Sequence, residues 1–150
     1  GNLFANLEQM TLAEIKSNIE DIIIAAVQVK KQVVEQDEKE SGLRKILNFG
    51  HTLGHGIESL YNLSELYHGE AVAIGMMMVT EDKAIKDRLA QVLEKLHLPT
   101  TIDYDSEQVF RLVSHDKKAG GNRISLITVP QIGKAEIKEL PITEIRRYLQ

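Results

Sequence analysis

Long helical periodicity narrows the possible folds of this chain more than any other property of its sequence. After Thr11, apolar residues recur at steps of three and four, the spacing that lines one face of an α-helix. They are Leu12, Ile15, Ile19, Ile22, Ile23, Ala26, Val29 and Val33. Thr11 and Glu14 have the spacing of a capping box. The pattern therefore predicts one helix from Thr11 to Gln36.

The rest of the chain continues the helical pattern and then changes period. Further helices are predicted over 43–61, 69–87, 88–97, 106–113 with Ser106 as N-cap, and 143–150 with Thr143 as N-cap. Gly50, Gly54 and Gly56 weaken the second of these and imply that a backbone or a ligand comes close. Two β-type runs around 131–134 predict a hairpin. The predicted fold class is mostly α, a multi-helix domain with a small β-hairpin near the C-terminus.

Composition excludes several classes of protein. With 43% hydrophobic and 27% charged residues, the 150-residue chain is globular. It has no cysteine, which rules out disulfides, thiol chemistry and Cys-ligated zinc. Its net charge of −4 argues against nucleic acid as a partner, and no apolar run is long enough for a membrane span. No secretion signal is apparent, so we expect a cytoplasmic protein.

Three histidines carry the clearest chemical signal. His51 and His55 are four residues apart, so on a helix they share a face, and His68 follows after a turn. Neutral imidazoles from two neighbouring elements are suitable ligands for a divalent metal. Thr52 follows His51, so this is not the HExxH protease motif. A metal here would act on the substrate directly, whereas the plainer alternative is a set of hydrogen-bonded or exposed histidines.

Cationic and amide side chains accompany these histidines. On one continuous helix, Arg44 and Asn48 would share the face of His51 and His55. Arg44 can bind a carboxylate or a phosphate through two hydrogen bonds. Lys30 and Lys31 end the first helix, and Lys117 and Lys118 precede a glycine pair. A metal with convergent cations predicts a polyanionic, oxygen-rich small molecule as the ligand, such as a phosphorylated sugar acid.

Three segments resemble the C-terminal domain of the 3-dehydroquinate synthase family, within the sugar-phosphate cyclases. They are VKKQVVEQDEKESGLRKILNFGHTLGHGIESLY, YHGEAVAIGMMM and DKKAGGNRISLITVPQIGKAEI. The resemblance covers nearly the whole chain. It implies a lyase of the shikimate pathway of aromatic amino acid biosynthesis. That enzyme converts 3-deoxy-D-arabino-heptulosonate 7-phosphate (DAHP) to 3-dehydroquinate and releases phosphate, using NAD⁺ and a Zn²⁺ or Co²⁺ ion.

The resemblance also implies roles for individual residues. His51 and His68 would be metal ligands, and His55 would lie near the substrate phosphate and take part in proton transfer. The substrate carboxylate or phosphate would be bound by Lys30, Arg44, Asn48 and Lys118. The neighbouring lysines at 31 and 117 are alternatives to the two named. Relatives of full length are homodimers, so a homodimer is expected of the whole enzyme.

The family pattern is incomplete in this sequence. No G-x-G-x-x-G occurs in it, and the resemblance places both the NAD-binding domain and a third metal ligand, a glutamate, upstream. Residues 1–150 are therefore expected to form the metal- and substrate-binding helical domain, inactive in isolation. Two alternatives stay open. One is a related cyclase such as 2-deoxy-scyllo-inosose synthase, which acts on glucose 6-phosphate; the other is a non-catalytic helical module.

Overall fold

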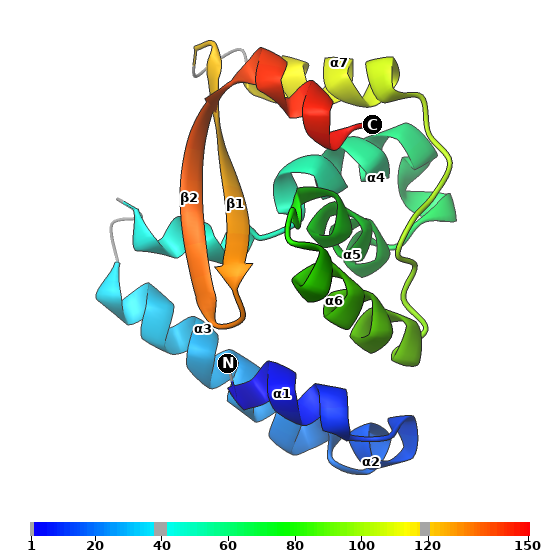
Figure 1. The fold of residues 1–150 in the computed structure, drawn as a ribbon, viewed down its shortest axis with the longest axis vertical. Helices are drawn as coiled ribbons and strands as arrows, with labels where there is room; N and C mark the ends of the chain where they lie inside the picture. Colours follow the sequence, from blue (N-terminus) through cyan, green and yellow to red (C-terminus); the bar gives the residue numbers. More distant parts are fainter. Residues whose placement is uncertain (1, 38–41, 118–120) are drawn as a thin grey trace.

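The computed structural model describes residues 2–37, 42–117 and 121–150, which form a mostly helical domain with one antiparallel hairpin (Figure 1). The predicted fold class is confirmed. The α-helices are α1 (Asn2–Gln9), α2 (Leu12–Ser17), α3 (Ile19–Gln36), α4 (His51–Glu65), α5 (His68–Val79), α6 (Lys83–Lys95) and α7 (Ser106–Lys117). Two 3₁₀ helices, η1 (Leu43–Asn48) and η3 (Ile142–Tyr148), and the strands β1 (Arg123–Gln131) and β2 (Lys134–Pro141) complete the described elements.

The predicted helix from Thr11 to Gln36 is broken at Asn18. The capping box is confirmed, with Glu14 N–H donating to the Thr11 hydroxyl and Thr11 N–H to the Glu14 carboxylate. Asn18, however, donates to the Glu14 carbonyl oxygen through both its backbone and its side chain. A short amide side chain can compete in this way for helical backbone groups. The result is two helices, α2 and α3, instead of one.

The predicted helix over 43–61 is also wrong as a continuous element. Residues 43–48 form the 3₁₀ helix η1, and α4 starts only at His51. Gly50 lies between them with a φ of +79°, a left-handed conformation that favours glycine. Because the helix axis changes there, the residues of η1 are not on a common helical face with those of α4.

Three other predicted boundaries need correction. The helix expected over 69–87 ends at Val79, and α6 begins at Lys83, where the Asp82 side chain accepts from the Ile85 N–H. Asp105, not Ser106, caps α7, because its carboxylate accepts the N–H groups of residues 107 and 108. The last helix is the 3₁₀ segment η3, which starts after Pro141 without a side-chain cap from Thr143.

The main hydrophobic core joins α4, α5 and α7 to the hairpin and η3. Its most deeply buried side chains include Leu53, Ile57, Ile74, Val109, Leu126 and Ile145. Met77 is buried, and Met76 and Met78 pack partly buried against the two core clusters. The methionine run of α5 is thus core packing, as its apolar neighbours indicate. Among the helices that the structure describes, none is long and apolar enough to cross a membrane.

The hairpin runs along one side of the helices, from η3 and α7 at one end to the region of α1 at the other (Figure 1). β1 and β2 pair antiparallel, and the turn contains Gly133 at a φ of +87°. Lys45 of η1 binds the Ser125 hydroxyl at 3.2 Å and the Glu139 carboxylate at 3.3 Å. These bonds fasten η1, the segment that precedes the histidines, to the hairpin.

Candidate functional site

Glycine contacts between α4 and α5 set the geometry of the histidine site. Gly54 of α4 lies so near α5 that a Cβ on it would be 2.8 Å from the Ala71 carbonyl oxygen. A Cβ on Gly75 would collide with the carbonyl oxygen of Gly50. The glycines therefore allow backbone-to-backbone packing, as their spacing predicts. Gly50 lies against Met76 and Gly54 against Ala71, so the two helices run in opposite directions. His68, at the start of α5, therefore lies opposite the part of α4 that follows Gly54.

The three histidines predicted from the sequence are brought together. The centroid of the His51 ring lies 5.7 Å from that of His55 and 5.5 Å from that of His68. The rings of His55 and His68 are also 5.5 Å apart. His51 is half-buried, while His55 and His68 are exposed. This arrangement leaves the cluster open to solvent, as a site for a metal and a substrate must be.

The environment of His51 fits a role as metal ligand. Its Nδ1 lies 3.2 Å from the carbonyl oxygen of Phe49, just before α4. A carbonyl oxygen only accepts, so Nδ1 carries the hydrogen and Nε2 keeps its lone pair when the ring is neutral. Metal-binding histidines are commonly held in this way through their second nitrogen. The donor set present therefore suits a divalent cation.

Glu58 joins this cluster and was missed by the sequence analysis. Among the described residues, one group of side chains has donor atoms within 4.8 Å of one another, as a metal ion requires; it consists of His55, Glu58 and His68 and does not include His51. Glu58 follows His51 by seven residues and His55 by three, so all three lie on one helical face. That spacing was the signal that could have identified it.

The predicted anion-binding residues are only partly assembled. Arg44 and Asn48 lie on η1, so the prediction that they share a helical face with His51 is wrong. Arg44 is half-buried, and its backbone N–H donates to the carboxylate of buried Asp37 at 2.9 Å, which fixes the start of η1. Asn48 is exposed at the end of the same segment.

The lysines predicted to bind the substrate are less well defined. Lys30 is exposed on α3, which packs against η1, whereas its neighbour Lys31 pairs with Glu35 at 3.6 Å. Both lysines are exposed, and an exposed pair of this kind is weak, so the choice between Lys30 and Lys31 stays a prediction. Lys118 lies outside the described residues, as does the side chain of Lys117, so the choice between those two stays a prediction.

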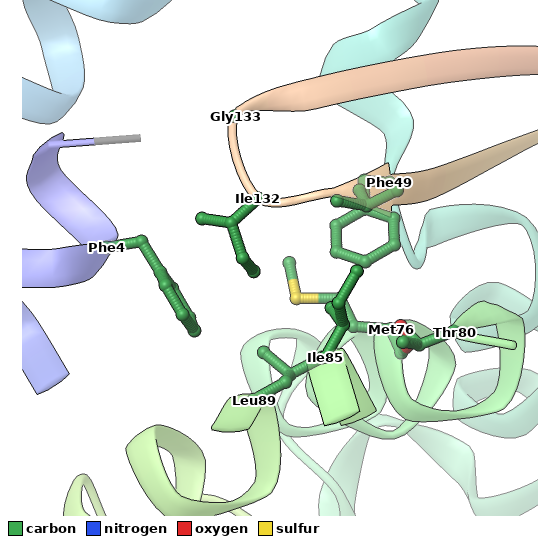
Figure 2. Close-up of a pocket in the computed structure, with 9 residues that line it drawn as sticks. Phe4, Phe49, Met76, Thr80, Ile85, Leu89, Ile132 and Gly133 are labelled. Carbon is green, nitrogen blue, oxygen red and sulfur yellow. The ribbon is translucent and has the colours of Figure 1, made fainter. Parts of the chain in front are cut away.

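A separate cavity of about 250 Å³ lies between α1, the hairpin turn, α5 and α6 (Figure 2). Phe4 enters it from one side and Ile132 from the hairpin turn, opposite Met76, Ile85 and Leu89. None of the nine described residues that line it carries a charge. An apolar lining of this kind offers no acid, base or metal ligand, so this cavity is not a candidate for the metal site.

Comparison with known proteins decides the family. The family model described as 3-dehydroquinate synthase C-terminal matches residues 1–119. The chain belongs to the 3-dehydroquinate synthase C-terminal family. A 3-dehydroquinate synthase of Enterococcus faecalis is 40% identical over 145 residues, covering 91% of this chain and 40% of the relative. One from Lactococcus lactis subsp. cremoris MG1363 is 39% identical over 158 residues, covering 99% of this chain and 44% of the relative.

A solved structure supports the fold. This chain is similar to a 2-epi-5-epi-valiolone synthase from Streptomyces hygroscopicus subsp. jinggangensis, a structure with NAD⁺ and Zn²⁺ bound. The TM-score is 0.79 at 23% identity, and the match covers 99% of this chain and 45% of that one. The fold of that neighbour thus covers essentially all of this chain. The chain spans about 40% of the length of the first curated relative that it matches.

Proposed function

We propose that this chain supplies the metal- and substrate-binding part of a 3-dehydroquinate synthase. The reaction is the conversion of DAHP to 3-dehydroquinate with loss of phosphate, a step of the shikimate pathway. The observation that carries the proposal is the convergence of His51, His55 and His68 at the α4–α5 contact, in a chain of this family. The half-buried Arg44 on the neighbouring η1 adds a cation suited to a carboxylate or phosphate.

In this proposal His51 and His68 hold a divalent ion, Zn²⁺ or Co²⁺. When bound, such an ion supplies Lewis-acid stabilisation to an oxygen of the substrate. The exposed ring of His55 lies 5.7 Å from that of His51 and 5.5 Å from that of His68, and we assign it to the substrate phosphate and to proton transfer. Arg44, Asn48, Lys30 and Lys118 orient the substrate through its anionic groups.

The proposal also concerns what the rest of such an enzyme contributes. The solved neighbour binds NAD⁺, and the sequence of this chain contains no glycine-rich dinucleotide motif. We therefore propose that NAD⁺ is bound mainly by a separate domain, that the chain alone is inactive, and that the complete enzyme is a cytoplasmic homodimer. NAD-dependent phosphate release from DAHP by the isolated chain would contradict this.

A chimaera tests the proposed activity. The N-terminal part of the Enterococcus faecalis 3-dehydroquinate synthase is joined to this chain in place of its own C-terminal part, and phosphate release from DAHP is measured with NAD⁺. We expect activity that falls by more than about 100-fold in His51→Ala and His68→Ala, since each removes a proposed metal ligand. His115→Ala, an exposed histidine of α7, is the matched control and should retain activity.

Two results would overturn the proposal. One is a chimaera whose phosphate release is unchanged by both histidine substitutions, which would remove the cluster from the reaction. The other is a chimaera that releases phosphate from glucose 6-phosphate and not from DAHP, which would favour a cyclase of the 2-deoxy-scyllo-inosose synthase type.

A further inference from the structure

Glu58 is placed between the two helices that form the histidine cluster. It belongs to α4, on the face shared by His51 and His55, and its side chain is 15% exposed against 53% for that of His68. A carboxylate so largely withdrawn from water loses solvation, which a hydrogen bond from a nearby donor restores. The roles carried over from the family do not include this residue.

The partner of Glu58 is the ring of His68 at the start of α5. The Nδ1 atom of His68 lies 3.1 Å from one carboxylate oxygen of Glu58 and 3.3 Å from the other. Carboxylate oxygens only accept, so Nδ1 is the donor in this contact. The bond therefore fixes the ring orientation and leaves Nε2 with its lone pair when the ring is neutral.

The two proposed metal ligands are then held in the same manner. His51 donates from Nδ1 to the Phe49 carbonyl oxygen, and His68 donates from Nδ1 to Glu58. We propose that Glu58 is a positioning residue for His68, which presents Nε2 of that ring to a divalent cation shared with His51. This inference rests on the proposed function and deepens it. Partners of this kind commonly change metal affinity by about 10–100-fold.

Direct ligation by Glu58 is the competing role, because its carboxylate lies with His55 and His68 in the set of donors within 4.8 Å of one another. The two roles respond differently to Glu58→Gln. A glutamine oxygen still accepts a hydrogen bond from Nδ1, but an uncharged amide is a much poorer ligand for a divalent cation. Rescue by glutamine therefore identifies a positioning role.

The first test is zinc affinity, measured by isothermal titration of the 150-residue chain with Zn²⁺. We expect Glu58→Ala to weaken binding by about 10–100-fold and Glu58→Gln to stay within a few-fold of the parent. Glu65→Gln, an exposed carboxylate at the end of the same helix, is the control and should leave affinity unchanged. Equal losses in Glu58→Gln and Glu58→Ala would contradict a positioning role, as would unchanged affinity in Glu58→Ala.

The second test needs no metal. Long-range ¹H–¹⁵N spectra of the metal-free chain in alkaline buffer report which ring nitrogen of His68 carries the hydrogen. We expect Nδ1–H in the parent and in Glu58→Gln, and Nε2–H in Glu58→Ala. The same tautomer in all three would overturn the inference. If phosphate release by the chimaera were unchanged in His51→Ala and His68→Ala, the proposed function would fail, but these spectra would still decide the role of Glu58.

Discussion

Gly75 is the residue at which the site depends most on the absence of a side chain. A Cβ there would collide with the Gly50 carbonyl oxygen and lie 2.8 Å from the Gly54 nitrogen, both backbone atoms that cannot move independently of α4. Gly75→Ala should therefore force α4 and α5 apart and destabilise the fold by about 1–3 kcal/mol or more. Urea denaturation followed by circular dichroism measures this change.

Gly69 provides the matched control for that substitution, because it is on the same helix but a Cβ would meet nothing within 4 Å. Gly69→Ala should be neutral or should stabilise the protein by up to about 1 kcal/mol through helix propensity. Equal destabilisation by the two alanines would show that the close approach of the helices is not what Gly75 provides.

At the residue scale, the sequence predicts the histidines but not their full surroundings. The four-residue step between His51 and His55, with His68 after a turn, is enough to predict convergence, and the structure brings the three rings together. The contact of Glu58 with His68 depends on how closely two helices pack, which the spacing of residues within one helix does not determine. Arg44 lies on η1 and not on the helix of the histidines, because Gly50 takes a left-handed conformation that the helical spacing does not reveal.

At the scale of the elements, side chains of α6 fix the position of α1 through hydrogen bonds. The Lys95 ammonium group donates to the carbonyl oxygens of Leu7, Glu8 and Met10 at 2.7–2.8 Å, closing the C-terminal end of α1. Arg88 adds two hydrogen bonds to the Glu8 carboxylate. Since hydrogen bonds to charged groups contribute about 1.5–3 kcal/mol, Lys95→Met should release α1.

Hydrogen exchange followed by mass spectrometry checks that prediction. Exchange over residues 2–10 should become at least about tenfold faster in Lys95→Met, a change of about 1.4 kcal/mol or more. Lys83→Met on the same helix removes only an exposed pair with Asp87 and should leave the exchange of α1 unchanged. Unaltered protection of α1 in Lys95→Met would contradict the account.

Element boundaries show where sequence patterns stop being informative. The apolar spacing continues through Asn18 without a gap, yet the backbone and side chain of Asn18 both bind Glu14 and end α2. Apolar spacing also fails to mark the helix break within residues 69–97. There the Asp82 carboxylate accepts from the Ile85 N–H and starts a new helix. Local hydrogen bonds decide these breaks, and periodicity of apolar residues does not record them.

At the scale of the whole molecule, one carboxylate joins three distant segments. Glu81, after α5, accepts hydrogen bonds from Tyr148 of η3, from Arg147 at 2.7 Å and from Lys138 of β2 at 3.1 Å. The Tyr148 hydroxyl, with Lys138 and Arg147, lowers the pKa of Glu81 from 4.5 to about 2 despite partial desolvation. The stability that this carboxylate contributes is therefore present above pH 4.5 and is lost as the pH falls toward 2.

Glu81→Gln tests this link. The variant should be less stable than the parent near neutral pH by on the order of 1 kcal/mol, a modest value because the group is partly exposed and screened. The difference in unfolding free energy between the two proteins should shrink as the pH falls from 4.5 to about 2. Urea denaturation at several pH values measures this difference. If it stayed constant between pH 4.5 and 2, the ionised Glu81 carboxylate would not be the source of the stability.

The stability that Tyr148 contributes is lost at high pH, whereas that of Glu81 is lost at low pH. Burial first, and then its hydrogen bond to Glu81, raises the pKa of Tyr148 from 10.0 to about 12. A raised pKa means stability that is full below pH 10 and is lost as the pH rises through about 12. Thermal denaturation of the parent should show this alkaline loss, and Tyr148→Phe, which cannot ionise, should show much less of it.

The exposed apolar residues of α3 indicate that the isolated chain self-associates. Ile19, Ile23 and Val27 lie at four-residue steps and are 45%, 54% and 57% exposed. A stripe of this kind usually marks an interaction surface. We expect the 150-residue chain to self-associate, and Ile23→Glu with Val27→Glu to lower its apparent mass in sedimentation experiments. Concentration-independent monomers of the parent chain would refute this.

The central claim is that the α4–α5 histidines form a metal site, and zinc affinity of the chain with its His51→Ala and His68→Ala variants tests it most directly. We predict that one zinc ion binds and that each substitution weakens binding by more than about 100-fold, beyond the loss expected from a partner that only orients a ligand. His115→Ala should bind zinc as the parent does. Zinc binding that survives both substitutions would contradict the claim and leave the cluster a structural feature of the fold.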